Sequence, residues 1–417
     1  MYALFIQLAT FFICSPVVTA AADALLVLVI LNEEFNFPVY KNISGTCPFT
    51  ILAMGFLKKI FKGKEEEVTV SSYADFWNWF RRNEKEFFKI VKDHEKVDDN
   101  FLSKLTPLLR QLGDDFYCVT GMIDDNTAEL IISTDGIIKE FVFAEEFIAA
   151  APVITRWKFT ALKPSTDIDT MGIEMDGHEF NSSNISFYSN DHDEYPDEID
   201  ITLVHKDFTE ENKETVTSGC LIYLDNLLGE YNTATMVDVV QVAGPEEGLE
   251  LIPVEKLQGY LIWRQKEFVE KYEGVRYGTE EDSYSTMEAE DENGLPVFAI
   301  INQDLVNWDA KASHPWMMIV DIKFDGPEDE GMPDETTNDL MNEFEDEILK
   351  QLPDADGYLN IGRETYKGTR TIYFACKEFR HSSKTVALLV KTYAGKLNVS
   401  YEIFKDKYWM TVNHLKA

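Results

Sequence analysis

Two short runs of polar residues have the composition of a hard-cation site. Asn190–Glu194 brings carboxylate, amide and imidazole groups together between two expected strands, and Asp354–Gly357 places two carboxylates before a glycine. Neither run has the D-x-D-x-D-G spacing with which a calcium loop surrounds its ion. His178-Glu179 lacks the second histidine of a zinc-protease helix. We interpret both runs as solvated turns, with a metal at Asn190–Glu194 as the alternative, and predict neither metal nor cofactor.

Catalytic motifs with a defined spacing are missing from the sequence. It contains no G-x-S-x-G nucleophile elbow, no phosphate-binding loop and no G-x-G-x-x-G dinucleotide fingerprint. Because there are 74 Asp and Glu residues, two acids close in sequence are no evidence for a glycosidase pair. The sequence therefore favours a non-enzymatic protein-interaction or regulatory module. The alternative is a hydrolase whose site is assembled from scattered carboxylates and histidines at a domain interface.

Residues Lys367–Phe374 follow part of the octet of an RNA-recognition strand. The octet reads K/R-G-F/Y-G/A-F-V-x-F/Y, and its aromatic residues stack on bases. Here the two base-stacking positions are Thr369 and Thr371. Stacking contributes about 1–3 kcal/mol per base, and the net charge of −36 repels phosphate. We therefore expect no nucleic-acid partner and no useful affinity for RNA at physiological salt.

The composition is that of a strongly acidic protein with enough apolar residues for packed cores. The 417 residues include 38 Lys and Arg against 74 Asp and Glu, and 45% are hydrophobic. Such a surface repels anionic lipid and suits partners that are cationic or apolar. The five cysteines form no C-x-x-C pair, which is typical of a reducing compartment. We expect a cytoplasmic protein with a protein partner; the partner's identity and the oligomeric state stay open.

The first 53 residues differ from the rest of the chain. Residues 4–19 are apolar enough for a signal peptide or anchor, but no Lys or Arg precedes them. From Met54 the sequence reads as a natural protein start, with a basic amphipathic tail and linker over 54–70. We interpret 1–53 as an extension from a misassigned start, so that the protein begins at or near Met54. The alternative is a genuine leader, with export or anchoring, and the tail would add only weak membrane contact.

Residues 71–275 have the pattern of a mixed α+β body domain. Ser72–Asp75 is a capping box, after which aromatic residues recur at helical spacing. Apolar runs between turn residues predict strands, and no regular βαβ repeat is present. The expected helices are 73–91, 101–112, 141–150, 210–228 and 253–272, and the expected strands are 116–123, 128–133, 154–162, 185–188, 199–204 and 237–242.

Residues 276–417 predict a C-terminal module. An acidic linker or hairpin arm (Thr279–Gly294) and a strand at Pro296–Ile301 lead into it. The pattern then reads strand, helix, strand, strand, helix, strand from Trp316 to Phe404. That order builds a ferredoxin-like split βαβ sandwich (βαββαβ) with both helices on one face of the sheet. The fold class expected for the chain is therefore α+β, with the larger mixed domain first.

Several short motifs in the module resemble a family known as domain of unknown function 695. They are Gly294-Leu295-Pro296, His314-Pro315-Trp316, Gly331-Met332-Pro333, Gly362-Arg363-Glu364, Arg370 with Ile372-Tyr373-Phe374, and Tyr408-Trp409. The resemblance covers residues 279–417 and implies a bacterial protein with the whole-chain architecture seen in Bacteroidetes. The family is similar to the inhibitor of ribonuclease E called regulator of ribonuclease activity B, which implies a binding domain. No catalytic residues are established for the family, so the resemblance supplies none.

Strand alternation in the module predicts an apolar patch on the face of the sheet opposite the helices. Alternate residues of a strand point to opposite faces. Met317, Ile319, Tyr373 and Phe404 fall on the face away from the helices. We predict that these four side chains form an interface with the body, with a separate partner or with a second copy.

Charge within the module is polarised along the sequence. Asp325–Glu347 contains eleven acids and no Lys or Arg, whereas residues 354–417 contain eleven Lys and Arg against six acids. We favour the interpretation that the acidic first helix and the basic second helix lie side by side and compensate one another. The alternative is a basic patch that receives an anionic partner and consists of Arg363, Lys367, Arg370 and Arg380.

Overall fold

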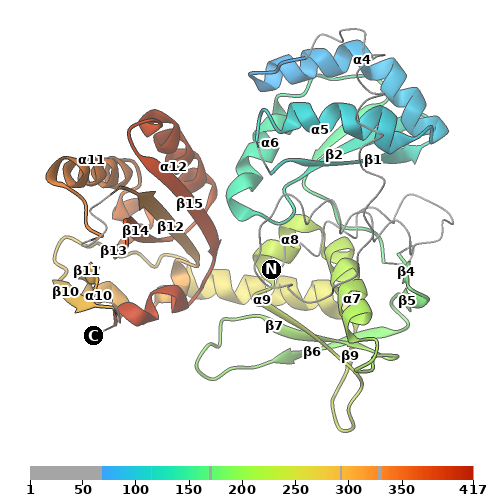
Figure 1. Cartoon of the computed structure of the whole chain (residues 1–417). Helices are drawn as coiled ribbons and strands as arrows, with labels where there is room; N and C mark the ends of the chain where they lie inside the picture. Colours follow the sequence, from blue (N-terminus) through green and yellow to red (C-terminus); the bar gives the residue numbers. More distant parts are fainter. Residues whose placement is uncertain (1–67, 114, 169–170, 292–293, 326–330, 417) are drawn as a thin grey trace, which may run out of the picture.

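The computed structural model describes residues 68–416 apart from 114, 169–170, 292–293 and 326–330. The protein is α+β, as predicted, with several separate sheets. Figure 1 shows an N-terminal part in blue and cyan, a middle part in green and yellow, and the C-terminal module in orange and red. Residues 71–275, expected as one body domain, thus form two parts with separate sheets. The leader 1–53 and residues 54–67 of the tail lie outside the described residues.

The N-terminal part packs three helices on a three-stranded sheet. The side chain of Ser72 accepts a hydrogen bond from the Asp75 amide and starts the first helix, as the capping box predicted. Its aromatic stripe, including Phe76 and Phe80, is fully buried. The elements are α4 (Tyr73–Asp93), η1 (Asp98–Leu102), α5 (Ser103–Leu109), β1 (Tyr117–Asp124), β2 (Thr127–Ser133), η2 (Ile138–Glu140), α6 (Phe141–Ala149) and β3 (Trp157–Ala161). Strand β2 is central, antiparallel to β1 and parallel to β3.

The middle part is a four-stranded sheet, in the order β8-β7-β6-β9, with its own core. Helix α7 approaches β5 so closely that a Cβ at Gly219 would lie 2.1 Å from the Phe180 ring. The elements are β4 (Ile173–Met175), β5 (His178–Phe180), β6 (Ile185–Asn190), β7 (Asp200–His205), α7 (Lys213–Leu228), α8 (Glu230–Met236), β8 (Val239–Ala243), β9 (Ile252–Pro253), η3 (Val254–Lys256) and α9 (Leu257–Tyr272). The sequence did not predict β4, β5, α8 or β9, which are all short.

The C-terminal module contains a six-stranded antiparallel sheet, in the order β10-β11-β13-β14-β12-β15. The acidic stretch before it is a hairpin arm, because β10 pairs with β11 along its whole length. The elements are β10 (Tyr284–Glu290), β11 (Pro296–Asn302), α10 (Gln303–Val306), η4 (Lys311–Ser313), β12 (Trp316–Lys323), α11 (Glu335–Gln351), η5 (Asp354–Asp356), β13 (Tyr358–Tyr366), β14 (Thr369–Cys376), α12 (Arg380–Tyr393), β15 (Asn398–Lys405) and η6 (Met410–Leu415).

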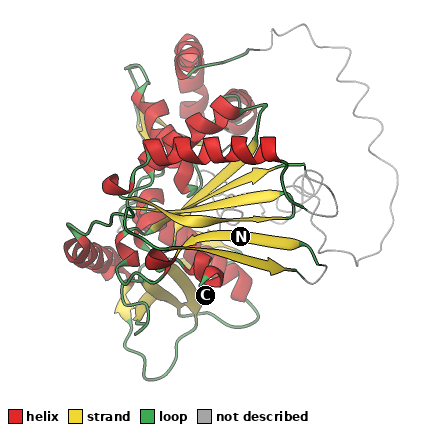
Figure 2. Cartoon of the chain, turned by 90° about the vertical axis from the view of Figure 1, so that its left-hand side faces the viewer, coloured by secondary structure: helices red, strands yellow, loops and turns green. Residues whose placement is uncertain are grey.

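Helices α11 and α12 lie on one face of this sheet, as the strand alternation predicted. Figure 2 shows helices above the fanned strands. Val320 and Phe374 of the strands share a buried cluster with Phe344 of α11 and Val386 of α12. Strands β13 and β14 are joined by Lys367-Gly368, whose φ values of 47° and 72° fit a tight hairpin turn. Within the described residues, no helix combines the length and apolar character needed to cross a bilayer.

The opposite face of the sheet is covered by the module itself. Met317 and Tyr373 belong to a second buried cluster, which also contains Trp409 and Leu415 of the C-terminal segment. Met317 and Tyr373 are therefore buried by the module's own C-terminal segment, because the chain folds back over this face after β15. Ile319 is partly buried against the same cluster, and Phe404 is 36% exposed. An interface with another surface stays a prediction for Phe404.

Candidate functional site

The middle part and the module meet at a buried carboxylate. Asp238 Oδ1 lies 2.8 Å from Lys405 Nζ, and Asp238 Oδ2 lies 2.7 Å from Lys407 Nζ. Burial would raise the pKa of Asp238, but the two lysines outweigh it and hold that pKa below its ordinary value. Burial also lowers the pKa of Lys405 to about 8. Lys405 is the last residue of β15, Lys407 lies two residues beyond it, and Asp238 immediately precedes β8, so this contact fastens the last strand of the module beside β8.

Asp197 forms a second contact between the same two parts. Its carboxylate accepts hydrogen bonds from Lys271 Nζ at 2.8 Å, from Tyr272 OH at 2.7 Å and from Tyr408 OH at 2.9 Å. Burial would raise the pKa of Asp197, but these donors hold it below its ordinary value. The carboxylate therefore has a structural role, because its oxygens are occupied by groups of the chain itself.

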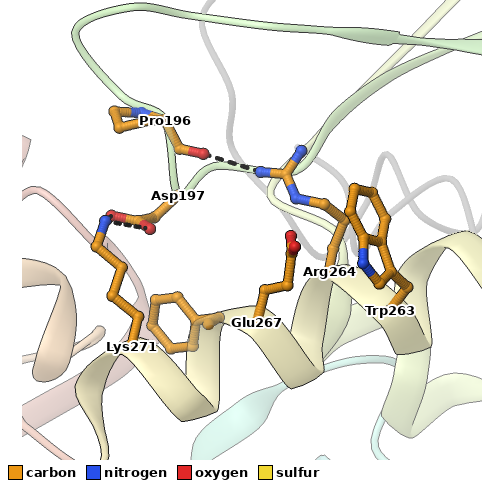
Figure 3. A pocket seen from close by; sticks show the side chains of 7 residues that line it. Pro196, Asp197, Trp263, Arg264, Glu267 and Lys271 are labelled. Carbon is orange, nitrogen blue, oxygen red and sulfur yellow. Dashed lines mark hydrogen bonds and ion pairs between the residues drawn. The ribbon is translucent and has the colours of Figure 1, made fainter.

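A hollow of about 440 Å³ lies between α9 and the loop that contains Pro196 and Asp197. Figure 3 shows the side chains of Trp263, Glu267 and Lys271 rising from the helix toward this loop. The Lys271 ammonium is held by Asp197. Arg264 donates to the Pro196 carbonyl. The Glu267 carboxylate lies between Lys271 and Arg264 and points into the hollow. The hollow thus combines an aromatic wall with an acidic group.

The outer face of α9 carries apolar side chains in water. Ile262, Trp263 and Val269 are 54%, 53% and 53% exposed. The inner face, with Leu257 and Leu261, is fully buried in the core of the middle part. Trp263 is thus a large aromatic side chain, half exposed, at the edge of the hollow.

A second hollow, of about 380 Å³, lies where all three parts of the chain meet. Its wall includes Glu145 of α6, Lys163 after β3, Tyr231 of α8 and Arg380 of α12. Arg380 donates from Nε and Nη2 to the two oxygens of Glu145, both at 2.8 Å. This two-pronged ion pair fixes the module to the N-terminal part, and it raises the pKa of Arg380.

Behind this hollow, Glu230 joins the N-terminal and middle parts. One carboxylate oxygen accepts hydrogen bonds from the Thr134 amide (2.9 Å), the Thr134 hydroxyl (3.2 Å) and the Gly136 amide (3.1 Å). The other oxygen accepts one from the Lys163 amide at 2.9 Å. Glu230 is 1% exposed, and Thr134 is fully buried, whereas the hydrogen bonds from Gly136 and Lys163 are only partly buried.

Three carboxylates and one lysine share this buried place. Lys163 Nζ lies 2.8 Å from Asp225 Oδ2 and 3.9 Å from Asp135 Oδ1. Burial raises the pKa of Asp135 to about 6, since the attraction of Lys163 is opposed by Glu230 and Asp225. Burial also raises the pKa of Asp225, against the pull of Lys163. The cluster therefore holds more negative charge than its single lysine balances.

Asp135→Asn is expected to stabilise the protein at neutral pH by about 1–2 kcal/mol. The pKa of Asp135 is about 6 in the folded state but has its ordinary, lower value in the unfolded chain. The free energy of unfolding therefore falls as pH rises between these two values. Asparagine removes the buried charge and tolerates the φ of 55° at this position. Urea unfolding at pH 4.5 and pH 7 measures the effect, which is expected to be clearly larger at pH 7.

Asp176→Asn is the matched control for that measurement. Asp176 is exposed, has a φ of 51° and also precedes a glycine, so it isolates the backbone preference for asparagine. Equal gains from both substitutions, or an equal gain from Asp135→Asn at both pH values, would contradict a role for the buried charge.

Of the four basic residues predicted as an anion-receiving patch, Arg363 and Arg370 lie together, because both donate to Asn342 Oδ1, but all four are held by other groups of the chain. Arg363 pairs with Glu345 of α11 and Lys367 with Asp291, at 3.1 Å for the second pair. Arg370 is 4% exposed, and its guanidinium donates to Asn338 and Asn342. Arg380 is bound to Glu145 of another part of the chain.

Helices α11 and α12 lie side by side, as the favoured interpretation of this charge pattern predicted, with Phe344 against Tyr393. The ion pairs of the two helices need a correction. Helix α11 does compensate basic residues, but they lie on β13 rather than on α12. The basic residues of α12 pair instead with α6, where Lys384 contacts Glu146. The basic side chains of α12 and the acidic side chains of α11 therefore form these ion pairs with other elements rather than with one another.

The runs that were considered for a cation are held by groups of the chain. His192 Nε2 lies 2.8 Å from Asp200 Oδ2, and this hydrogen bond raises the pKa of His192. Asp354 accepts hydrogen bonds from the Thr279 amide and hydroxyl, and Gly357, with φ 95°, turns the chain into β13. Across the residues that the structure describes, no three His, Cys, Asp or Glu side chains are placed to hold a metal ion.

Residues 291–415 match the model of a family described as a family of unknown function (DUF695). The match covers the module from the turn after β10 to the end of η6 and supports the family that the sequence motifs indicated. No significant match was found among curated proteins or solved structures.

Proposed function

We propose that the chain is a non-enzymatic protein-binding protein, in which the outer face of α9 and the hollow beside Trp263 receive a partner. The observation that carries this proposal is the 53% exposure of Trp263 at the edge of a 440 Å³ hollow. Tryptophan is among the residues that contribute most to binding when a partner covers them. A regulatory role is also what the resemblance to an inhibitor of ribonuclease E implies.

The arrangement of charges supports binding over catalysis. The lysines and arginines between the parts, such as Lys271, Lys407 and Arg380, are each held by a carboxylate of the chain. A catalytic site needs a titratable group that can reach a substrate. Here the groups between the parts hold the chain together instead.

The alternative of a hydrolase at the domain interface has one observation in its favour. Asp135, with a pKa near 6, lies close to the hollow between the three parts. However, the nearest cation is Lys163, which is bound to Asp225. Both carboxylate oxygens of Glu230 already accept hydrogen bonds from backbone amides. No histidine contributes to that wall. The cluster is better explained as a structural joint.

The ferredoxin-like assignment of the module belongs to the same proposal. The four strands of the predicted βαββαβ unit are, in chain order, β12, β13, β14 and β15. Their order in the sheet is β13-β14-β12-β15, that is, second, third, first and fourth, which is the order of the ferredoxin-like fold. We also propose a bacterial, cytoplasmic protein. The free thiols of Cys118, Cys220 and Cys376 support a reducing compartment.

Trp263→Ala is expected to remove the partner while leaving the protein folded. Affinity capture from native lysate, followed by mass spectrometry, compares this variant with the parent. Leu388→Ala is the control, because Leu388 is a 60% exposed apolar residue on α12, away from α9. Proteins retained by the parent and by Leu388→Ala, but reduced about tenfold or more by Trp263→Ala, support the proposal. Identical sets from all three proteins would overturn it.

A further inference from the structure

The two edges of the six-stranded sheet differ in their surroundings. Strand β15 forms the edge that faces the rest of the molecule, and β10 forms the edge on the far side of the module (Figure 1). The β15 edge is covered by η2 of the N-terminal part, where Lys139 Nζ donates to the Tyr401 carbonyl at 3.0 Å and pairs with Glu402. Among the described residues, no strand pairs with the outer side of β10.

An uncovered edge strand is a place where another chain can add a strand. Its outward amide and carbonyl groups are paired only with water, and proteins use such edges to bind extended peptides. Strand β10 is seven residues long and pairs with β11 without a break in register, so it offers a regular template.

An exposed apolar patch adjoins this edge. Tyr284 of β10 is 55% exposed, and Phe298 and Ile300 of β11 are 38% and 39% exposed. The register places Thr286 opposite Ile300 and Glu288 opposite Phe298, so all of these side chains lie on one face. Arg363, opposite Ile300 on β13, shares that face and contacts α11. The patch is therefore on the helix side of the sheet, beyond the strands that α11 covers.

The charge along this edge selects the kind of strand that could pair with it. Residues 279–291 contain six acids and no Lys or Arg. Glu288 and Glu290 share the face of Tyr284, because they alternate with it along β10. A cationic residue opposite a strand glutamate is favourable, and a like charge is unfavourable.

We propose that β10 binds a basic, extended segment of another protein by antiparallel strand addition. The segment places Lys or Arg opposite Glu288 and Glu290 and apolar side chains opposite Thr286 and Tyr284, where they cover the exposed patch. Self-pairing is disfavoured, because two copies carry a net charge of −36 each and would gather four glutamates in one strand pair. This surface is separate from the α9 face.

The probe is the seven-residue peptide Lys-Thr-Lys-Thr-Val-Thr-Val, which has the proposed pattern in antiparallel register with Glu290–Tyr284. We expect saturable binding to the full chain, by fluorescence anisotropy of the labelled peptide. Glu288→Lys with Glu290→Lys is expected to weaken it by about tenfold or more. The control, Glu246→Lys with Glu247→Lys, makes the same charge change in a loop of the middle part and should leave binding unchanged.

Backbone pairing is tested separately from charge. N-methylation of one alternating set of peptide amides should abolish binding, and N-methylation of the other set should preserve it, because only one set faces β10. Equal binding by the two methylated peptides, an equal loss in both charge variants, or no binding at about 1 mM peptide would overturn the proposal. A dimer in sedimentation velocity that is lost in the variant Glu288→Lys with Glu290→Lys would also overturn the proposal, because a second copy of the chain would then occupy the edge. Trp263→Ala should bind the peptide as the parent does.

Discussion

Replacing Glu230 with alanine is expected to lower the free energy of unfolding by about 3–5 kcal/mol. The substitution removes the acceptor of the amides of Thr134, which is buried, and of Gly136 and Lys163, which are partly buried. Buried donors without an acceptor cost more than the hydrogen bonds contributed, because the groups have already lost their water. The relief of repulsion with Asp135 and Asp225 offsets only part of the loss. Urea unfolding at pH 7 measures it.

Two further variants sharpen this test. Glu230→Gln retains one acceptor oxygen but turns an NH₂ group toward a donor, so an intermediate loss is expected. Glu335→Ala removes an exposed glutamate from the first turn of α11 and should change stability by less than about 0.5 kcal/mol. A loss below about 1 kcal/mol for Glu230→Ala would show that the carboxylate does not hold the two parts together.

Asp238→Ala is expected to have a similarly large effect, of about 3–5 kcal/mol, centred on the contact between module and middle part. The substitution leaves Lys405 and Lys407 buried without their shared counter-charge. The loss should be smaller at pH 9 than at pH 7, because burial already lowers the pKa of Lys405 and a neutral amine is cheaper to bury. Urea unfolding at pH 7 and pH 9, with limited proteolysis of residues 273–283, measures both stability and detachment.

Removing the lysine charges should restore what Asp238→Ala loses. The triple variant Asp238→Ala, Lys405→Met, Lys407→Met removes all three of these charges, and apolar replacement of a buried ion pair is often neutral or stabilising. If this triple variant is as unstable as Asp238→Ala alone, the lost free energy of unfolding comes from poorer packing at the contact rather than from unpaired charge.

Much of the fold was predictable because it depends on local patterns. The capping box at Ser72, the alternation in β12 and β14, and the glycine turn at Gly368 each act within a few residues. The division of the body into two parts was not predictable, since both have the same mixed composition. Short elements such as β9 were missed because tertiary contacts, rather than their own sequence, hold them in place.

The candidate site was much harder to predict than the fold. Asp238 and Lys407 are far apart in the sequence and are ordinary charged residues in a chain with 74 acids. Trp263 falls in a helix whose pattern indicates an amphipathic element, but the side it exposes depends on where β6 and the module lie. Tyr408-Trp409 was noted as a motif, whereas its role in covering the sheet follows only from the fold-back of the C-terminal segment.

The three contacts between the parts also close a circle. Glu230 joins the middle part to the N-terminal part, Arg380 joins the N-terminal part to the module, and Asp238 joins the module to the middle part. In an open row of three domains, one hinge can move alone. In a closed triangle, no corner can open unless a second one slips, so bending and twisting of the parts are coupled across the whole molecule.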